Sequence, residues 1–265
     1  MDETHFIISL TTLPSRFNNL KTCLASLLNQ KYDNFEVHLN IPKFNIFEGE
    51  YIHNIDIKNN KLKIFYIDDI GSISKIYYTL LRTNKDQMII SVDDDYTYHP
   101  NMLKVYNNIV SKFENCCIGF AGIYPLQNNI LYSNDTLPFI GPADNPTFVG
   151  ILEGYKSICY KRDFFEPDFF KLISEKKMNW CENYIYYEDD VVISSYLGYK
   201  NIKKIVVPPF GINGNYEGPR MLSFPLNNIL NNTNSGCYKY RKLFDTQYNN
   251  ITKFYNDDLG IYIKK

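Results

Sequence analysis

The sequence has no excess of either charge and no long apolar run. Its 28 basic and 29 acidic side chains give a net charge of −1 over 265 residues. A nucleic-acid or anionic-membrane surface needs clustered excess Lys and Arg, so we expect no nucleic-acid partner. The longest apolar runs are strand-sized, well short of the ~20 residues of a spanning helix, so we expect no transmembrane segment.

The features of a secreted, disulfide-stapled protein are also missing. The start, 1–5, is acidic, whereas a secretory signal begins basic. The six cysteines form no C-x-x-C pair, and a chain of this length can build its own core. We therefore expect reduced cysteines, no signal peptide and a cytoplasmic location. Rich use of Asn, Ile, Lys and Tyr is typical of an AT-biased genome, such as that of a large virus or a parasite, and for a viral protein the expected location is the host cytoplasm.

Two common nucleotide-binding motifs are absent as well. No G-x-x-x-x-G-K-[ST] loop occurs, which disfavours a P-loop kinase or ATPase. No G-x-G-x-x-G follows the first strand-like run, which disfavours a Rossmann dehydrogenase.

The first hundred residues do contain alternating strand and helix patterns. Strand-like runs occur at 6–10, 35–41, 62–67 and 88–92. Helical spacing predicts a helix after a candidate N-cap at Ser15 and another from about Ser74. This alternation predicts an α/β fold with a mainly parallel sheet, which binds ligands at the carboxyl ends of its strands.

The second half is more mixed, and it shows no repeat and no clear linker. We expect helices at 100–113 and from about Asp190, and strands at 117–121, 150–160 and 202–207. Gly and Pro concentrate at 209–222, as in a mobile loop. The chain is therefore expected to form one continuous domain.

Three consecutive carboxylates, Asp93-Asp94-Asp95, follow the apolar run at 88–92. Burying an unpaired carboxylate costs several kcal/mol, so such a run needs compensation. If strand geometry continued, Asp93 and Asp95 would share a face about 6.6 Å apart while Asp94 pointed elsewhere. That pair suits a hard divalent cation shared with substrate phosphates, as in transfer of a group from a diphosphate. A solvated acidic turn is the alternative.

A second acidic cluster, Glu188-Asp189-Asp190, stands at the start of an expected helix. Carboxylates there are stabilised as anions by the helix dipole, so simple capping is one interpretation. The other is a general base aimed at an acceptor hydroxyl. In that case the first cluster would hold metal and donor, and the second would deprotonate the acceptor.

Together these residues resemble a GT-A-fold, nucleotide-sugar-dependent glycosyltransferase close to the family 2 type. The segment 8–16 followed by Leu24-x-x-Leu27-Leu28-x-Gln30 is similar to the start of such enzymes, and the Asp triplet matches their DxD motif. Asp189-Asp190-Val191 stands where they carry a Glu-Asp pair. Gly71-x-x-x-Lys75 and Gly150-x-x-x-Gly154 are similar to segments of a bacterial and viral branch.

The resemblance covers about residues 6–210 and implies a single GT-A (Rossmann-like) domain. Its parts would be a nucleotide-binding half at 1–100, an acceptor half at 101–222 and a C-terminal strap at 223–265. It also implies inverting hexosyl transfer from a nucleotide sugar, most often a UDP-sugar, with Mn²⁺ or Mg²⁺. The acceptor hydroxyl would belong to a glycan, a protein or a lipid-linked acceptor in glycan synthesis.

Site residues follow from the resemblance position by position. The donor would be bound by Thr11, Thr12, Arg16, Asp69, Lys75, Asp93 and Asp94. The metal would be held by Asp95 and Asp93. The base would be Asp190 with Asp189 as its neighbour. The chain departs from the family pattern at Asn40 (usually Asp), Ser72 (usually Pro) and Asp189 (usually Glu).

Two other functions of the chain stay open, and so do possible roles of a few further residues. The alternatives are a nucleotidyltransferase and a non-catalytic protein that binds a nucleotide sugar or glycan. His99 could reach the metal, although a capping role is favoured. Trp180 and the tyrosines up to Tyr187 could stack on an acceptor sugar, and Arg220 could reach the diphosphate.

Overall fold

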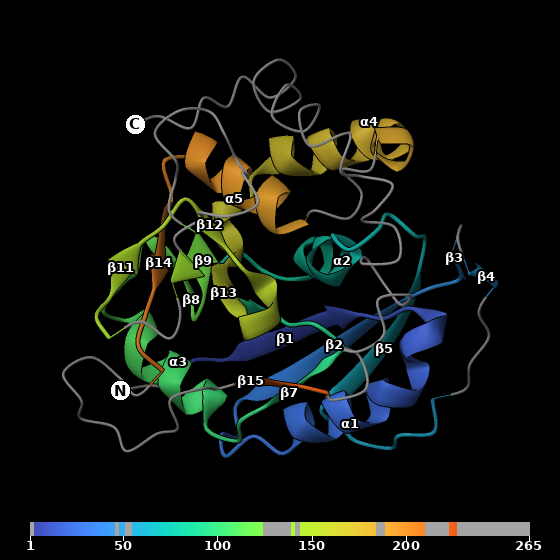
Figure 1. The fold of residues 1–265 in the computed structure, drawn as a ribbon, viewed down its shortest axis with the longest axis horizontal. Coiled ribbons are helices and arrows are strands. Elements are labelled where there is room, and N and C mark those ends of the chain that lie inside the picture. The colour runs from blue at the N-terminus through green and yellow to red at the C-terminus, as the bar shows by residue number, and fades with distance from the viewer. Residues whose placement is uncertain are drawn as a thin grey trace.

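The computed structural model describes residues 3–45, 48–50, 55–123, 139–140, 144–183, 189–209 and 223–226. Its centre is an eight-stranded sheet in the order β11-β14-β8-β13-β6-β1-β2-β5 (Figure 1). No helix among these residues is both long and apolar enough to span a membrane.

The strands of the main sheet are mostly parallel. β1 (Phe6–Thr11) pairs in parallel with β2 (Phe35–Pro42) and with β6 (Met88–Ser91), and β2 continues to β5 (Leu62–Ile67). β8 (Cys116–Gly119) and β14 (Lys203–Val206) are also parallel. Two strands run antiparallel, β13 (Ile158–Lys161) between β6 and β8, and β11 (Thr147–Phe148) at the edge.

Helices cover both faces of this sheet. On one face lie α1 (Phe17–Leu28) and α3 (Met102–Val110), and on the other α2 (Ser74–Arg82), α4 (Pro167–Asn183) and α5 (Asp189–Tyr199) (Figure 1). β1 shows why: Ile7 packs into the cluster with α2 and α5, and its neighbours Phe6 and Ile8 pack with α1 and α3. Successive strand residues face opposite sides, so an all-apolar strand needs a helical layer on each.

Short elements complete the fold. β15 (Ser223–Pro225) pairs antiparallel with β7 (Tyr96–Tyr98), and Leu226 N–H donates to the Asp95 carbonyl at 3.0 Å. A small sheet contains β10 (Phe139–Ile140), β9 (Gly122–Ile123) and β12 (Ile151–Leu152), and β3 (Phe44–Asn45) pairs with β4 (Gly49–Glu50). Single 3₁₀ turns are η1 (Pro14–Arg16), η2 (Gly154–Lys156) and η3 (Arg162–Phe164).

The structure confirms the predicted α/β class, a mainly parallel sheet flanked by helices, and is consistent with a GT-A (Rossmann-like) fold. The four cysteines described at side-chain level are free and buried: Cys23, Cys116, Cys117 and Cys159. Cys181 and Cys237 lie outside that description.

Three predictions of local structure were wrong or incomplete: a helix cap, a strand and the C-terminal half. Ser15 does not cap α1: it lies in η1, and its N–H and hydroxyl both donate to the Glu48 carboxylate, each at 2.8 Å. The strand expected at 150–160 is broken by η2 into β12 and β13. Helix α4 was not predicted, and of the segment 223–265 only 223–226 is described.

Candidate active site

The acidic triplet lies at the carboxyl end of β6, beside the end of β1. Ser9 and Ser91 are partners in the parallel register, so Thr12 and the triplet both follow the same edge of the sheet. β6 ends at Ser91, and Asp94 and Asp95 form a turn before β7. The structure therefore places the triplet where an α/β sheet binds ligands.

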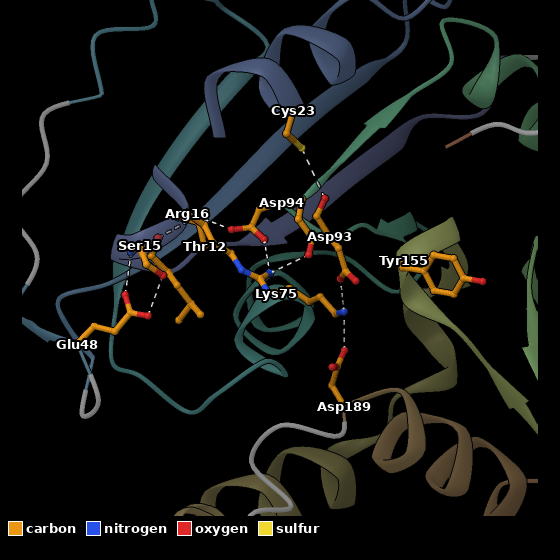
Figure 2. A network of polar contacts seen from close by, with 12 residues as sticks. Thr12, Ser15, Arg16, Cys23, Glu48, Lys75, Asp93, Asp94, Tyr155 and Asp189 are labelled. Carbon is orange, nitrogen blue, oxygen red and sulfur yellow. Dashed lines mark hydrogen bonds and ion pairs between the residues drawn. The ribbon is translucent and has the colours of Figure 1, made fainter. Parts of the chain in front are cut away.

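Strand geometry does not extend through the triplet. The prediction that Asp93 and Asp95 share a face while Asp94 points elsewhere is therefore wrong. Asp94 is buried, accepting the Thr12 hydroxyl at 2.6 Å and Arg16 Nη1 at 2.8 Å (Figure 2). The same Arg16 nitrogen lies 3.3 Å from Asp95 Oδ2. Asp93 turns away from Arg16 toward Lys75, because residues in a turn no longer alternate between two faces.

Lys75 joins the two acidic clusters. From the first turn of α2, its Nζ lies 2.7 Å from Asp93 Oδ1 and 2.8 Å from Asp189 Oδ2 (Figure 2). Burial alone would lower the pKa of Lys75, but the carboxylates of Asp189, Asp93 and Asp190 together raise it well above its ordinary value. The ammonium therefore stays charged and holds together carboxylates almost a hundred residues apart in sequence.

Asp190 is the second residue of α5 and lies beside this bridge. Its Oδ2 accepts the backbone N–H of Gly154 at 2.8 Å. Its Oδ1 is buried and has no hydrogen-bond partner among the described residues. Burial, and next the charge of Asp189, raise the pKa of Asp190 well above its ordinary value. A carboxylate with one oxygen anchored, the other unpaired and a raised pKa has the properties of a general base.

The backbone of Asp93 is held by residues that sequence reasoning missed. Asp93 N–H donates to the Tyr98 hydroxyl at 2.9 Å, and that hydroxyl donates to the Asp93 carbonyl at 3.2 Å. Cys23 Sγ donates to the same carbonyl at 3.6 Å. Burial, then the charge of Asp93, raise the pKa of Tyr98 well above its usual range, so it stays a phenol. Among many aromatics, no spacing signal singled it out.

Two donor residues assigned by resemblance make hydrogen bonds that do not reach the triplet. The Thr11 hydroxyl donates to the Asn40 carbonyl of β2 at 2.8 Å. Asp69 accepts the Asn45 side chain at 2.7 Å and the Gly71 N–H at 2.9 Å, and Gly71 needs its positive φ of 81° in this turn. The bond of Thr11 joins β1 to β2, and the bonds of Asp69 shape the loop between β5 and α2.

Several other candidates can now be placed. Asn40 is buried and accepts a hydrogen bond from Arg82, so this departure from the family pattern belongs to a polar network under the sheet. His99 Nδ1 accepts the N–H of Asn101 at 3.1 Å, a local bond at the residue before α3. The side chain of Trp180, the segment 184–188 with Glu188 and its tyrosines, and Arg220 lie outside the described residues.

The carboxylates fit a divalent cation shared with a diphosphate better than a metal cage of protein ligands alone. Among the described residues, no three His, Cys, Asp or Glu side chains form a group that could hold a metal. Asp95 Oδ1 is nevertheless buried without a hydrogen-bond partner among them. Burial is the main cause that raises the pKa of Asp95 to about 7, and Arg16 opposes this shift. An unpartnered carboxylate oxygen is the donor that a hard cation prefers.

Comparisons with known proteins add little to this geometry. No family model and no curated protein matches the chain. Among solved structures it is similar to residues 1–349 of TarS from S. aureus in complex with UDP-GlcNAc, with 12% identity over 73% of this chain and a TM-score of 0.43. The match covers 53% of that chain, so this chain spans about half of its length. A similarity at this level says nothing of substrate or activity.

Proposed function

We propose that this protein is an inverting glycosyltransferase that moves a sugar from a nucleotide sugar, of the UDP-sugar class, to an acceptor hydroxyl. The observation that carries the proposal is the Lys75 bridge between Asp93 and Asp189. It brings a donor-side acidic turn and a partly buried candidate base, Asp190, to one end of a mainly parallel sheet.

In the proposed reaction, the Asp190 carboxylate accepts the proton of the acceptor hydroxyl. The hydroxyl oxygen bonds to the anomeric carbon as the bond from that carbon to the nucleoside diphosphate breaks. The raised pKa of Asp190 makes it a stronger base than an ordinary carboxylate, once it is ionised. The N–H of Gly154 donates to Oδ2 and so fixes the orientation of the carboxylate.

Basic side chains support the donor side. Arg16 fixes the turn through Asp94, and Lys75 keeps Asp93 beside the base. Asp95 and Asp93 are the residues that would hold Mn²⁺ or Mg²⁺. When bound, such a cation supplies neutralisation of the charge that grows on the departing diphosphate.

The test is a nucleotide-sugar screen of the purified chain. We expect at least one UDP-sugar to raise the unfolding temperature with Mn²⁺ and not with EDTA, because ligands that bind the native state stabilise it. The same donor should release UDP when glycan acceptors are supplied.

Two other results would replace the proposal. Release of pyrophosphate from a nucleoside triphosphate would identify a nucleotidyltransferase. Stabilisation by a UDP-sugar with no UDP released from any donor, with or without acceptors, would identify a binding protein.

A further inference from the structure

Gly154 lies near the point where the three-stranded sheet, through β12, packs against helix α5. It begins η2, two residues after β12 ends. Two hydrogen bonds join this segment to α5: Leu152 N–H donates to the Ser194 hydroxyl at 3.1 Å, and Gly154 N–H donates to Asp190 Oδ2 at 2.8 Å. Residues 152 and 154 are two apart in the chain, and residues 190 and 194 are one helical turn apart. The pair of bonds therefore fixes α5 in register with the segment.

Space, and not backbone conformation, requires glycine at this position. A Cβ on Gly154 would lie 2.8 Å from Asp190 Oδ1 and 3.0 Å from Lys75 Nζ. Only Gly49 and Gly71 are found at positive φ among the described glycines, so alanine can adopt the Gly154 backbone. Both atoms in the way are ends of side chains in the proposed site, Lys75 being buried and Asp190 having a buried Oδ1, so they would have to shift.

The contact gives the two oxygens of Asp190 different surroundings. Oδ2 is occupied by the Gly154 N–H, and Oδ1 is buried without a hydrogen-bond partner among the described residues. The hydrogen bond also favours the ionised carboxylate, in opposition to burial, which raises the pKa of Asp190. Gly154 thus affects both the direction of the carboxylate and the pH at which it becomes ionised.

We propose that Gly154 is a positioning residue for Asp190, whose backbone N–H and missing side chain together hold the carboxylate in the orientation that the base needs. The proposal rests on the function proposed above. It adds a residue that touches neither donor nor acceptor and acts through the base.

The experiment compares Gly154→Ala with Gly198→Ala, a matched control in the last turns of α5. A Cβ on Gly198 would meet only Lys204 Nζ, at 3.3 Å. With the UDP-sugar and acceptor turned over by the wild type, we expect kcat of Gly154→Ala to fall at least ~10-fold, within the range that a general base contributes. The acidic limb of its pH–rate profile should move to higher pH. Dissociation constants for UDP with Mn²⁺ should change less than about twofold, and Gly198→Ala should match the wild type.

A stability readout separates positioning from misfolding. The unfolding temperature of Gly154→Ala should drop less in an Asp190→Ala background, because that background removes the oxygen 2.8 Å away. An unchanged kcat and pH profile would overturn the proposal, and so would equal losses of kcat and of UDP–Mn²⁺ binding. If the wild type turns over no nucleotide sugar, the proposed function fails first, and the Gly154–Asp190 coupling in stability is still measured by itself.

Discussion

Two basic side chains each contact two aspartates in this site, and they do so in different ways. Arg16 contacts Asp94 and Asp95, which are adjacent in the chain. Lys75 contacts Asp93 and Asp189, which come from opposite halves of the chain. Arg16 therefore stabilises the shape of one turn, and Lys75 stabilises the approach of two segments.

The two clusters also differ in charge balance. Around Lys75 three carboxylates, Asp189, Asp93 and Asp190, raise the pKa of a single ammonium that is almost fully buried. Asp94 forms an ion pair with Arg16 and also accepts a hydrogen bond from the Thr12 hydroxyl. Loss of Lys75 would leave carboxylates from two segments without a cation, whereas loss of Arg16 would leave Asp94 one hydrogen bond. The comparison predicts that the bridge between segments is the more costly to break.

The largest effect is expected for Lys75→Met. Removing one partner of a buried ion pair typically costs about 3–5 kcal/mol, because the remaining charges are buried and unpaired. The measurement is the free energy of unfolding by urea at neutral pH. The matched control is Lys200→Met, whose partners Glu166 and Asp168 are exposed, so its cost should stay below about 1 kcal/mol. Equal costs for the two variants would contradict the assignment of Lys75 as the bridge.

Asp190→Asn should have its largest effect on turnover. We expect kcat to fall by at least ~100-fold with UDP–Mn²⁺ binding retained, because the amide cannot accept the proton. Full turnover in this variant would exclude Asp190 as the base.

The same variant should flatten the dependence of stability on pH. The pKa of Asp190 is higher in the folded state than in the unfolded state. Between these two pKa values the folded state therefore binds more protons. The contribution of Asp190 to stability is present below the unfolded pKa and is lost as pH rises through the window up to the folded pKa. Unfolding curves of wild type and Asp190→Asn across that window measure the difference, and parallel curves would contradict it.

The smallest effect is expected for Arg16→Met. Asp94 keeps its bond from Thr12, so we expect a loss of about 1–3 kcal/mol, the cost of an unsatisfied buried group, and less than for Lys75→Met. Arg16→Lys should recover part of the loss by restoring the charge. Urea unfolding of the three variants side by side gives the ranking, and a greater loss for Arg16→Met than for Lys75→Met would reverse the comparison.

The sheet was predictable because its strands are short apolar runs. β1, β2, β5 and β6 match the expected runs to within a residue or two at each end. Helix α4 was missed because its described buried residues, Phe169 and Ile173, give only a short periodic signal in a charged segment.

The contacts of the site were less predictable than its residues. The sequence points to Asp93, Asp189 and Asp190 as acidic groups, but no spacing in the chain says that Lys75 lies between them. The need for glycine at position 154 is likewise a matter of free volume, which exists only once η2 and α5 have packed. Residue types suggest chemistry, whereas pairing depends on where distant segments meet.

The short pairing of β15 with β7 has a mechanical consequence. β7 begins immediately after the triplet, and Leu226 N–H is bonded to the carbonyl of Asp95 itself. Tension or displacement applied to the chain beyond residue 226 is thus transmitted, through a single layer of backbone hydrogen bonds, to the peptide units that set where the three carboxylates stand.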